Sequence, residues 1–576
     1  MLSDDGIRSS AADHASTLLL DENLPSPLYG LPGIGVEISK PLVSPVQAGK
    51  TDEHAQLQTF ELKLLSLRAL WNANVAIHAL PAEVLLEVFK YLLAPQYRYL
   101  GARGGDLRRP WARLMGVCRH WCALIRKAAV FWTTIEVSTN TSWLKLALRR
   151  SGSAPIRVTL SSGCDMDITL PALVQHSSHL GALNMYTPTT HALQPLFSGV
   201  LPLLRFLDLT NQVPDLTNQL DPSSQRVHSG KSTVFIRHDN CPRLQKLSLT
   251  RFPFAWTSPL LANLQNLTLR DCQLSMKPLP FAEFLDVLEH GQRLQDLQLG
   301  HFLSTALSNQ TSVPNERLVT LPKLTFLQCA DVPAHIARLV SHLRTLSVCD
   351  FELTGDSDPN DPSASYASLL PRPGAARETF TSPVFSIILE VGHKANAVAL
   401  ELASGGTCRL ELFSAGAVQW DRWLERGLRQ LLALFPSGEA QMTTLSIEGN
   451  LDSVSLDTWA STFDTFPMLR ILTLDTQGVD EFPVALTDAL SVLCDTRLVA
   501  GEEGKGTRIR CPALQELDIY GHEWGKSAME HLLACLHARA GGGAPKLKRL
   551  KLLLGDEITR GLRQRLCDSA ERFDIW

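Results

Sequence analysis

The residues of this sequence that could do chemistry are few, and the first to consider are two cysteines and a histidine. Cys118, His120 and Cys122 lie close together, and thiolate and imidazole groups at short spacing are ligands that Zn²⁺ prefers. A structural zinc site needs four ligands, usually in two pairs, and no second pair at finger spacing follows. We therefore favour a place in the core for Cys118 and expect no bound metal.

Two further segments match known motifs only in part. Residues 501–507 read GEEGKGT, whereas a phosphate-binding loop needs four residues between its glycines and a hydroxyl directly after its lysine. His522, Glu523 and His531 lack the spacing of the HExxH zinc-protease motif. The sequence also has no GxSxG elbow and no cysteine-nucleophile signature. We therefore expect a binding protein that is not an enzyme and carries no cofactor.

Cys118 belongs to a segment that predicts two amphipathic helices. The first helix should open at Leu80-Pro81, because a proline at the first helical position gives up an N–H that would have no partner there. Its apolar positions fall along one side at helical spacing. These positions are Val84, Leu85, Val88, Phe89 and Leu92.

The second helix should be continuous, because its apolar residues step by three and four positions. They are Trp111, Leu114, Cys118, Trp121 and Ile125. Phe131 and Trp132 then precede the alternating residues 134–137. We expect these two rings to form a buried plug through which the chain passes into a strand.

These helices carry a resemblance to a known family. LPxEVLLxVFxxL from Leu80, VCxxW from Val117 and the pair Phe131-Trp132 stand in the order of an F-box. The segment resembles most the F-box domains that are numerous in mushroom-forming fungi. The resemblance implies docking onto a Skp-type adaptor of a cullin-RING ubiquitin ligase, while the rest of the chain selects the protein to be ubiquitinated. The adaptor-facing and supporting residues would be Leu80, Pro81, Val84, Leu85, Val88, Leu92, Val117 and Trp121.

Composition bounds the remaining possibilities. The 576 residues include 54 lysines and arginines against 58 acidic residues, for a net charge of −4, whereas a nucleic-acid binder would show a basic surplus. The 12 cysteines are sparse and irregularly placed, as in a reduced intracellular protein. We find neither a signal peptide nor an apolar run of the ~20 residues that span a bilayer. We expect a cytoplasmic or nuclear protein that binds neither nucleic acid nor membrane.

We predict three parts along the chain. Residues 1–50 mix serine, proline and glycine without a period and should form a disordered lead-in. Residues 51–137 hold the F-box-like unit, preceded by a helix over 53–74. The apolar side of that helix, from Leu57 to Trp71, should pack on the F-box helices or on the adaptor. Residues 138–576 form the third part.

The third part repeats a short phrase, apolar-x-x-Leu-x-apolar, and the repetition predicts its fold. In a leucine-rich repeat the final Leu-x-apolar alternation is a short strand, and stacked copies build a parallel sheet. The spacing of the copies is uneven, so we predict an α/β fold in which the small helical F-box unit is followed by an irregular leucine-rich-repeat-like solenoid. The second leucines of the eleven copies are Leu183, Leu207, Leu247, Leu267, Leu297, Leu327, Leu346, Leu445, Leu472, Leu517 and Leu550.

The longest interval between copies needs its own interpretation. Residues 350–379 are polar and broken by prolines and glycines, which predicts an exposed loop. Residues 385–391, 397–403 and 408–413 alternate like strands, so degenerate repeats or a small meander should fill the rest.

A target-binding face follows from strand geometry. If the leucines point inward, the residues between them must point out of the sheet; we select Ser248, Thr268, Gln298 and Gln328 as substrate-binding candidates. Loops at 211–232 and 350–380 are alternatives. The function we favour is a substrate-recruiting F-box subunit. The alternative is a repeat scaffold that binds a protein partner without any ubiquitin-ligase link, with the F-box-like hairpin as its amino-terminal cap.

Overall fold

The computed structural model describes residues 50–98, 110–138, 141–187, 193–211, 236–274, 278–307, 317–345, 348–358, 360–372, 384–392, 395–414, 423–435, 442–476, 484–499, 506–521, 526–553 and 559–575. The chain divides into two compact units, Met1–Leu244 and Gln245–Trp576, and each is described by itself. The predicted disordered lead-in lies outside the described residues. The predicted boundary at 137/138 falls inside the first unit, at the end of its first strand.

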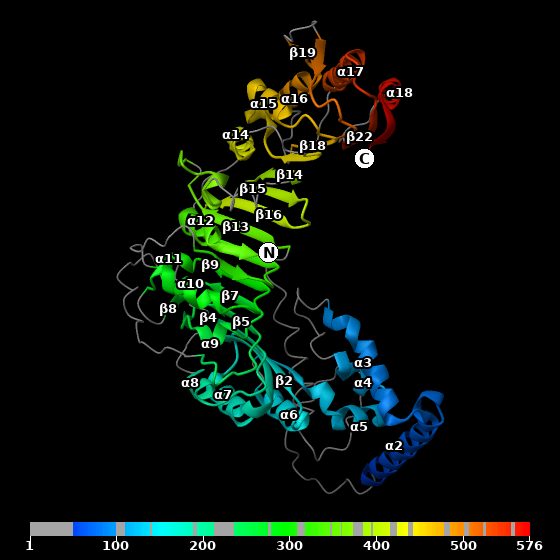
Figure 1. Ribbon diagram of the computed structural model, residues 1–576. Coiled ribbons are helices and arrows are strands. Elements are labelled where there is room, and N and C mark those ends of the chain that lie inside the picture. Colours follow the sequence, from blue (N-terminus) through cyan, green and yellow to red (C-terminus); the bar gives the residue numbers. More distant parts are fainter. Residues whose placement is uncertain are drawn as a thin grey trace. The chain divides into compact units, whose positions relative to one another are not determined.

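The first unit begins with helices and continues into alternating strands and helices (Figure 1). Its helices are α2 (Lys50–Ala73), η1 (Ala76–Ala79), α3 (Ala82–Arg98), α4 (Pro110–Met115), α5 (Arg119–Lys127), η3 (Ala129–Trp132), α6 (Thr141–Ser151), α7 (Met166–Gln175), η4 (Ser177–His179) and α8 (Gln194–Ser198). Its strands are β1 (Thr134–Val137), β2 (Ile156–Leu160), β3 (Leu180–Thr187) and β4 (Phe206–Asn211).

The four strands of the first unit form a parallel sheet in chain order. β1 pairs with β2, β2 with β3 and β3 with β4. Along β1 the burial alternates, with Ile135 and Val137 in the core, as a strand with one covered face requires. The predicted strand at 134–137 is confirmed, and β1 and β2 extend the sheet upstream of the first repeat phrase.

The predicted second helix is not continuous, which corrects the sequence interpretation. It is divided into α4 and α5, and Cys118 between them is extended, with φ −158° and ψ 165°. The Cys118 sulfur accepts the Trp121 N–H at 3.5 Å, which satisfies one of the amide groups that a helix start leaves without an intrahelical partner. The apolar stripe is therefore carried by two short helices, and Cys118 is the N-cap of the second.

The predicted aromatic plug is confirmed. Phe131 and Trp132 are buried, and the Trp132 ring centroid lies 4.7 Å from that of Trp111 and 5.4 Å from that of Trp143 on α6. The Trp132 Nε1–H donates to the Ile125 carbonyl at 2.9 Å. One tryptophan therefore joins α4, α5 and α6 and ties the helical segment to the sheet of the first unit.

The second unit continues the alternation of strands and helices to its end (Figure 1). Its strands are β5 (Lys246–Thr250), β6 (Pro253–Phe254), β7 (Asn266–Arg270), β8 (Gln273–Leu274), β9 (Asp296–Gly300), β10 (Val319–Leu321), β11 (Phe326–Asp331), β12 (Leu343–Thr345), β13 (Asp350–Asp356), β14 (Val384–Val391), β15 (Ala395–Leu402), β16 (Thr407–Phe413), β17 (Thr444–Glu448), β18 (Ile471–Asp475), β19 (Thr496–Val499), β20 (Gly506–Ile509), β21 (Glu516–Tyr520), β22 (Leu547–Leu553) and β23 (Ala570–Ile575). Its helices are α9 (Ser258–Leu261), α10 (Phe281–Glu289), α11 (Leu303–Ala306), α12 (Pro333–Ser341), η8 (Tyr366–Leu369), α14 (Leu424–Leu434), η9 (Leu451–Ser453), α15 (Leu456–Thr465), α16 (Val484–Cys494), α17 (Lys526–Gly541) and α18 (Arg560–Ser569).

The large sheet of this unit is mostly parallel. β5, β7, β9, β11 and β13 pair successively in parallel, and so do β17, β18, β21, β22 and β23. The predicted inward second leucines are confirmed in ten of the eleven phrases, and Leu346 of the remaining phrase lies outside the described residues. The buried second leucines of the two units are Leu183, Leu207, Leu247, Leu267, Leu297, Leu327, Leu445, Leu472, Leu517 and Leu550.

The middle of the sheet departs from chain order. β13 pairs in parallel with β16, and β14 pairs in parallel with β17. Between them, β15 pairs antiparallel with both β16 and β14. The three strands β14–β16 are the predicted meander, which is confirmed, but it lies in reversed order. A three-strand meander turns back on itself twice, so its last strand can meet β13 while its first strand meets β17.

Two expectations about residues 343–379 were wrong. The seventh phrase forms β12, which pairs with β10 in a separate sheet, and Leu346 itself lies outside the described residues. The next residues form β13 in the main sheet, where Phe351 and Leu353 are buried, although an exposed loop was expected over 350–379. Tyr366 on η8 is also fully buried. The polar residues of 350–356 suggested a loop, but they alternate with apolar residues along β13, which has one face in the core and one outside it.

A local geometry recurs from strand to strand. The first leucine of a phrase donates its N–H to the carbonyl three residues earlier, at 3.2 Å in Leu244 and Leu264 and at 3.0 Å in Leu294. Directly after β5, β7 and β9 the residues Arg251, Asp271 and His301 have φ of 60°, 51° and 47°. Left-handed backbone is uncommon outside glycine, so its return at the same place indicates repeated structural units.

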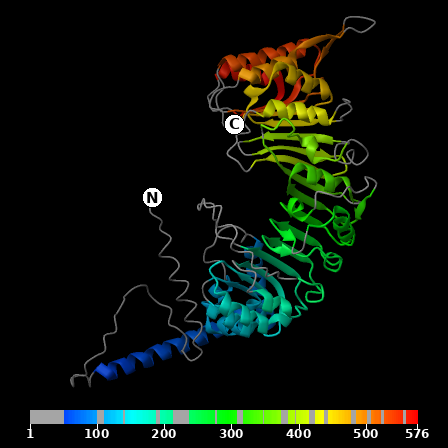
Figure 2. The ribbon, with the colours of Figure 1, turned by 90° about the vertical axis from the view of Figure 1, so that its left-hand side faces the viewer.

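Helices cover one face of the sheet. Figures 1 and 2 show α10, α11 and α12 along the same side of the green strands, and their buried residues include Phe284, Leu303 and Leu339. The apolar residues over 281–290 and 529–540 recur at helical spacing, and these segments form α10 and α17. The opposite face, which carries the residues between the inward leucines, is called the open face below.

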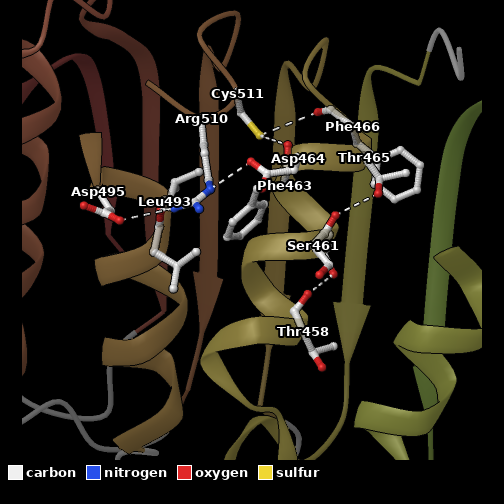
Figure 3. Close-up of polar contacts among 12 residues, drawn as sticks. Thr458, Ser461, Phe463, Asp464, Thr465, Phe466, Leu493, Asp495, Arg510 and Cys511 are labelled. Atoms are coloured by element: carbon white, nitrogen blue, oxygen red, sulfur yellow. Dashed lines mark hydrogen bonds and ion pairs between the residues drawn. The ribbon is translucent and has the colours of Figure 1, made fainter. Parts of the chain in front are cut away.

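A buried arginine joins two helices near the end of the second unit (Figure 3). Arg510 is 6% exposed. Its Nε lies 2.9 Å from Asp464 Oδ1 on α15, and its Nη1 lies 3.0 Å from the Val492 carbonyl on α16 and 3.6 Å from Asp495 Oδ2. One cation therefore holds α15 and α16 together.

Replacing Arg510 with alanine is expected to loosen α15 and α16. The loss should be about 2 kcal/mol, because bonds to charged groups are worth about 1.5–3 kcal/mol and the freed carboxylates are exposed enough to be hydrated. Amide hydrogen exchange of the two helices should accelerate roughly 30-fold, since 1.4 kcal/mol is tenfold. Arg563→Ala, at an exposed position of α18, is the control; equal exchange in the two variants would contradict this role.

Candidate functional site

The first candidate site is the outer side of α3, where the helical stripe is divided into a covered and an uncovered half. Leu85 and Phe89 are 0% exposed, whereas Val84 is 45% and Leu92 is 51% exposed. Val88 lies between the halves and is half-buried. The stripe is wider than the neighbouring helices can cover, so an apolar side remains in solvent.

The start of α3 presents two more of the predicted residues. The helix begins at Ala82, and the Leu85 N–H donates to the Pro81 carbonyl at 3.0 Å. Pro81 was predicted at the first helical position and instead lies one residue before it. Leu80 and Pro81 are both exposed. Leu80 is extended, with φ −68° and ψ 142°, so it adds an exposed apolar side chain just before the helix.

α5 supports this surface from below. The Trp121 ring centroid lies 4.6 Å from that of Phe89, so Trp121 is a packing residue that is only half-exposed. Val117, in the turn between α4 and α5, is 57% exposed. The predicted set therefore separates into exposed residues and supporting residues, and Leu85 belongs wholly to the support because its side chain is buried.

One exposed residue of the surface was not selected from the sequence. Tyr91 is 80% exposed and follows Val84 by seven residues, which is two helical turns. This seven-residue spacing could have identified Tyr91 from the sequence, because it places the tyrosine on the same side of the helix as Val84. Lys90 lies off the stripe and pairs with Glu87 at 2.5 Å.

The helix α2 is confirmed over the predicted span, but it does not pack on α3, α4 or α5 within the described residues. Its apolar side chains are open to solvent, with Leu64 49% and Trp71 79% exposed. In Figure 2 no described helix or strand of the first unit lies along the blue α2. Of the two expected partners, only the adaptor remains as a proposal.

The second candidate site is the open face of the large sheet. Ser248, Thr268, Gln298 and Gln328 lie in one register row across β5, β7, β9 and β11, and all four are half-buried. The side-chain amides of the two glutamines already have partners. Gln298 Nε2 donates to Asp296 Oδ1 at 3.1 Å, and Gln328 Nε2 donates to Glu352 Oε2 at 2.9 Å. Their alternation is confirmed, while a substrate-binding role stays a prediction. Most of the competing loop at 211–232 and parts of 350–380 lie outside the described residues.

The described histidines and cysteines among the residues considered for chemistry are Cys118, His120, Cys122 and His531. Among the described residues, no group of three or more His, Cys, Asp and Glu side chains is placed to hold a metal ion. His531 Nε2 instead bonds Ser491 Oγ at 2.9 Å. Residues 501–505 of the glycine-rich loop and the pair His522-Glu523 lie outside the described residues.

The cysteine thiols are mostly unreactive core groups. All are free, and burial raises the pKa of Cys241 to about 12 and that of Cys272 to about 11. The thiolate is the reactive form, so these groups stay inert near neutral pH. No described helix has the length and apolarity that a membrane crossing requires.

Comparison with known proteins places the first site in a family. Residues 77–138 match the family described as F-box-like, a span that runs from η1 through α3, α4, α5 and η3 to β1. The chain therefore carries an F-box-like domain, and domains of this kind generally bind Skp-type adaptors of ubiquitin ligases. No curated protein matches the chain.

Proposed function

We propose that this protein is a substrate-recruiting F-box subunit of a cullin-RING ubiquitin ligase. It would bind a Skp-type adaptor through the exposed side chains of Leu80, Val84, Leu92 and Val117, called the α3 surface below. It would hold a target protein on its sheet. The observation that carries the proposal is the uncovered apolar half of α3 inside the segment that matches the F-box-like family. Leu85 and Phe89 complete the core below it, so Val84 and Leu92 are free to contact a partner.

The size of this surface suits a protein partner. Fully burying a valine or leucine side chain is worth about 1.5–3 kcal/mol, and interface energy is concentrated in a few central residues. Leu80, Val84, Leu92 and Val117 are each exposed by 38% to 57%. Covering the remaining apolar area of these four would supply several kcal/mol.

We infer that α2 enlarges the adaptor surface. It leads directly into η1 and α3, and its side from Leu57 to Trp71 is exposed although it is strongly apolar. An uncovered run of leucines and aromatic rings marks an interaction site. The adaptor is the partner that the adjoining α3 surface already implies.

For the sheet we propose an irregular leucine-rich-repeat-like solenoid. The support is the recurrence of the buried leucine, the turn before it and the left-handed residue after it. Cys272 lies at the place where such repeats carry a polar residue. It donates its Sγ–H to the Leu249 carbonyl of the preceding strand β5 at 3.3 Å. Repeat arrays commonly offer an extended sheet surface for binding.

In this proposal the protein performs no chemistry of its own and acts in the cytoplasm or nucleus. It would hold the target close to the ubiquitin-transferring enzyme, which raises the effective concentration of target lysines. The residues that matter are then those that bind the adaptor on α3 and those that bind the target on the open face.

The test is direct binding of the full chain to a purified Skp-type adaptor. We expect one stable complex on size-exclusion chromatography, and ubiquitin chains on co-purified proteins after the cullin-RING core is added. The absence of a complex at about 10 μM of each protein would mean a binding free energy weaker than about −7 kcal/mol, and it would overturn the proposal. The alternative scaffold without a ubiquitin-ligase link would then be favoured.

A further inference from the structure

The open face carries a row of carboxylates on β14, β17 and β18. Glu448 is in register with Glu390 on one side and with Asp475 on the other, and neighbouring strands lie about 4.8 Å apart. Arg409 offsets the charge at one end, with its Nη2 3.1 Å from Glu390 Oε2. In the middle of the row the pKa of Glu448 is raised by burial and by the two adjacent carboxylates. The row is therefore a strip of negative potential.

A second observation comes from the next strand, β21, where Asp518 is in register with Thr473, two residues before Asp475 on the same face. Asp518 on β21 lies between the core residues Leu517 and Ile519, so alternation places it on the open face. It is only 9% exposed, and its Oδ1 has no hydrogen-bond partner among the described residues. A buried carboxylate oxygen without a donor is costly, and the cost is removed when a ligand supplies the donor.

The neighbouring cations do not fill that role. Lys551, in register with Asp518, donates from Nζ to Tyr520 Oη at 2.8 Å. Arg549 lies 3.1 Å from Asp574 Oδ2 and 3.5 Å from Glu516 Oε2. Both cations attract Asp518 from a distance, but burial outweighs them and raises the pKa of Asp518.

This part of the open face differs from the part over β5–β11. There the side chains bond one another, as Gln328 does with Glu352, whereas Asp518 retains an unused acceptor. Ile388, which lies two residues before Glu390 on β14, is 38% exposed. Apolar side chains next to carboxylates suit lysine and arginine, which bury an aliphatic stem and present a charged head.

We propose that Glu390, Glu448, Asp475 and Asp518 form the target-binding site, and that they take a basic protein segment whose lysine or arginine head reaches Asp518. The site rests on the proposed function, since it names the class of target that the F-box subunit would recruit. It lies on the same open face as the sequence-selected residues but several strands further along. Arginine suits it best, because its guanidinium carries several donors in a fixed fork.

The test is fluorescence anisotropy of the full chain with a labelled lysine- and arginine-rich peptide of about a dozen residues. A peptide with glutamate in place of the basic residues is the matched probe. We expect the basic peptide alone to bind, and Glu448→Gln with Asp518→Asn to weaken it roughly tenfold or more, because two charge-assisted contacts are lost. Glu283→Gln with Asp457→Asn, which neutralises two exposed carboxylates on the helices α10 and α15, should bind as the wild type does.

Three results would overturn the site: no binding of the basic peptide, equal binding of the acidic peptide, or unchanged affinity in the Glu448→Gln, Asp518→Asn variant. Thermal unfolding of that variant should occur at or above the wild-type temperature, because a carboxylate without a partner is removed; a fall would assign Asp518 to the fold. Adaptor binding is measured on the same samples. Adaptor bound without peptide refutes this site alone, and peptide bound without adaptor refutes the ubiquitin-ligase role alone.

Discussion

Replacing Val84 and Leu92 together with glutamate is expected to abolish binding of a Skp-type adaptor. Each apolar side chain that a partner covers is worth about 1.5–3 kcal/mol, and burying two carboxylates without partners adds a further cost. The combined loss should exceed about 4 kcal/mol, which is roughly 1,000-fold in affinity. Isothermal titration of the adaptor into each variant would measure it.

The control for this experiment is Ile168→Glu with Val200→Glu. These residues are 42% and 58% exposed in the same unit but lie outside the matched residues 77–138. Their substitution should leave adaptor affinity within about twofold, because exposed positions away from the interface contribute little. Circular dichroism should show an unchanged helix content in both variants. Full affinity in the Val84, Leu92 variant would refute the α3 surface as the docking site.

Replacing Trp132 with alanine is expected to cost about 3–5 kcal/mol of stability in the first unit, as other large-to-small core changes involving tryptophan do. The ring is 1% exposed and contacts Trp111 and Trp143, so its removal leaves a cavity between three helices. Hydrogen exchange in α4, α5 and α6 should therefore accelerate by at least about 100-fold. Adaptor affinity should fall as well, because α5 supports α3 through Trp121 and Phe89.

Two comparisons separate packing from hydrogen bonding at this position. Trp132→Phe keeps a ring in the cluster and loses the bond from Nε1 to the Ile125 carbonyl, so it should cost about 1–2 kcal/mol beyond the loss of ring size. Trp71→Ala removes a tryptophan that is 79% exposed and should change stability by less than about 0.5 kcal/mol. A Trp132→Ala protein with wild-type exchange rates would show that the plug is dispensable.

Local patterns were sufficient for many of the elements. The inward leucines, among them Leu267, Leu297 and Leu472, could be named from the alternation, because successive strand residues point to opposite faces whatever the partner strand is. The helix at 53–74 was predicted from apolar residues at helical spacing, and the plug from the pair Phe131-Trp132 before an alternating segment. The F-box-like segment is recognisable from residue order alone.

The neighbours of each element were decided only by the tertiary structure. A helical stripe shows that Val84 and Leu85 are both apolar, but only the packing of α4 and α5 on α3 decides that Leu85 is covered and Val84 is not. The phrase at Leu343 obeys the repeat pattern and yet forms β12 outside the main sheet, while β13 takes the place beside β11. Strand pairing depends on contacts between distant residues, which a local phrase does not encode.

The two candidate surfaces show the same limit. Alternation placed Thr268, Ser446 and Asp518 on one face of the sheet, and the sequence could not distinguish them further. Asp518 is in register with Lys551 of β22, and burial raises its pKa although Arg549 and Lys551 lower it. The sequence by itself determined which residues leave the core. The packing of separate strands decided which of them lacks a partner, because burial and charge at one position depend on residues that only the folded chain brings together.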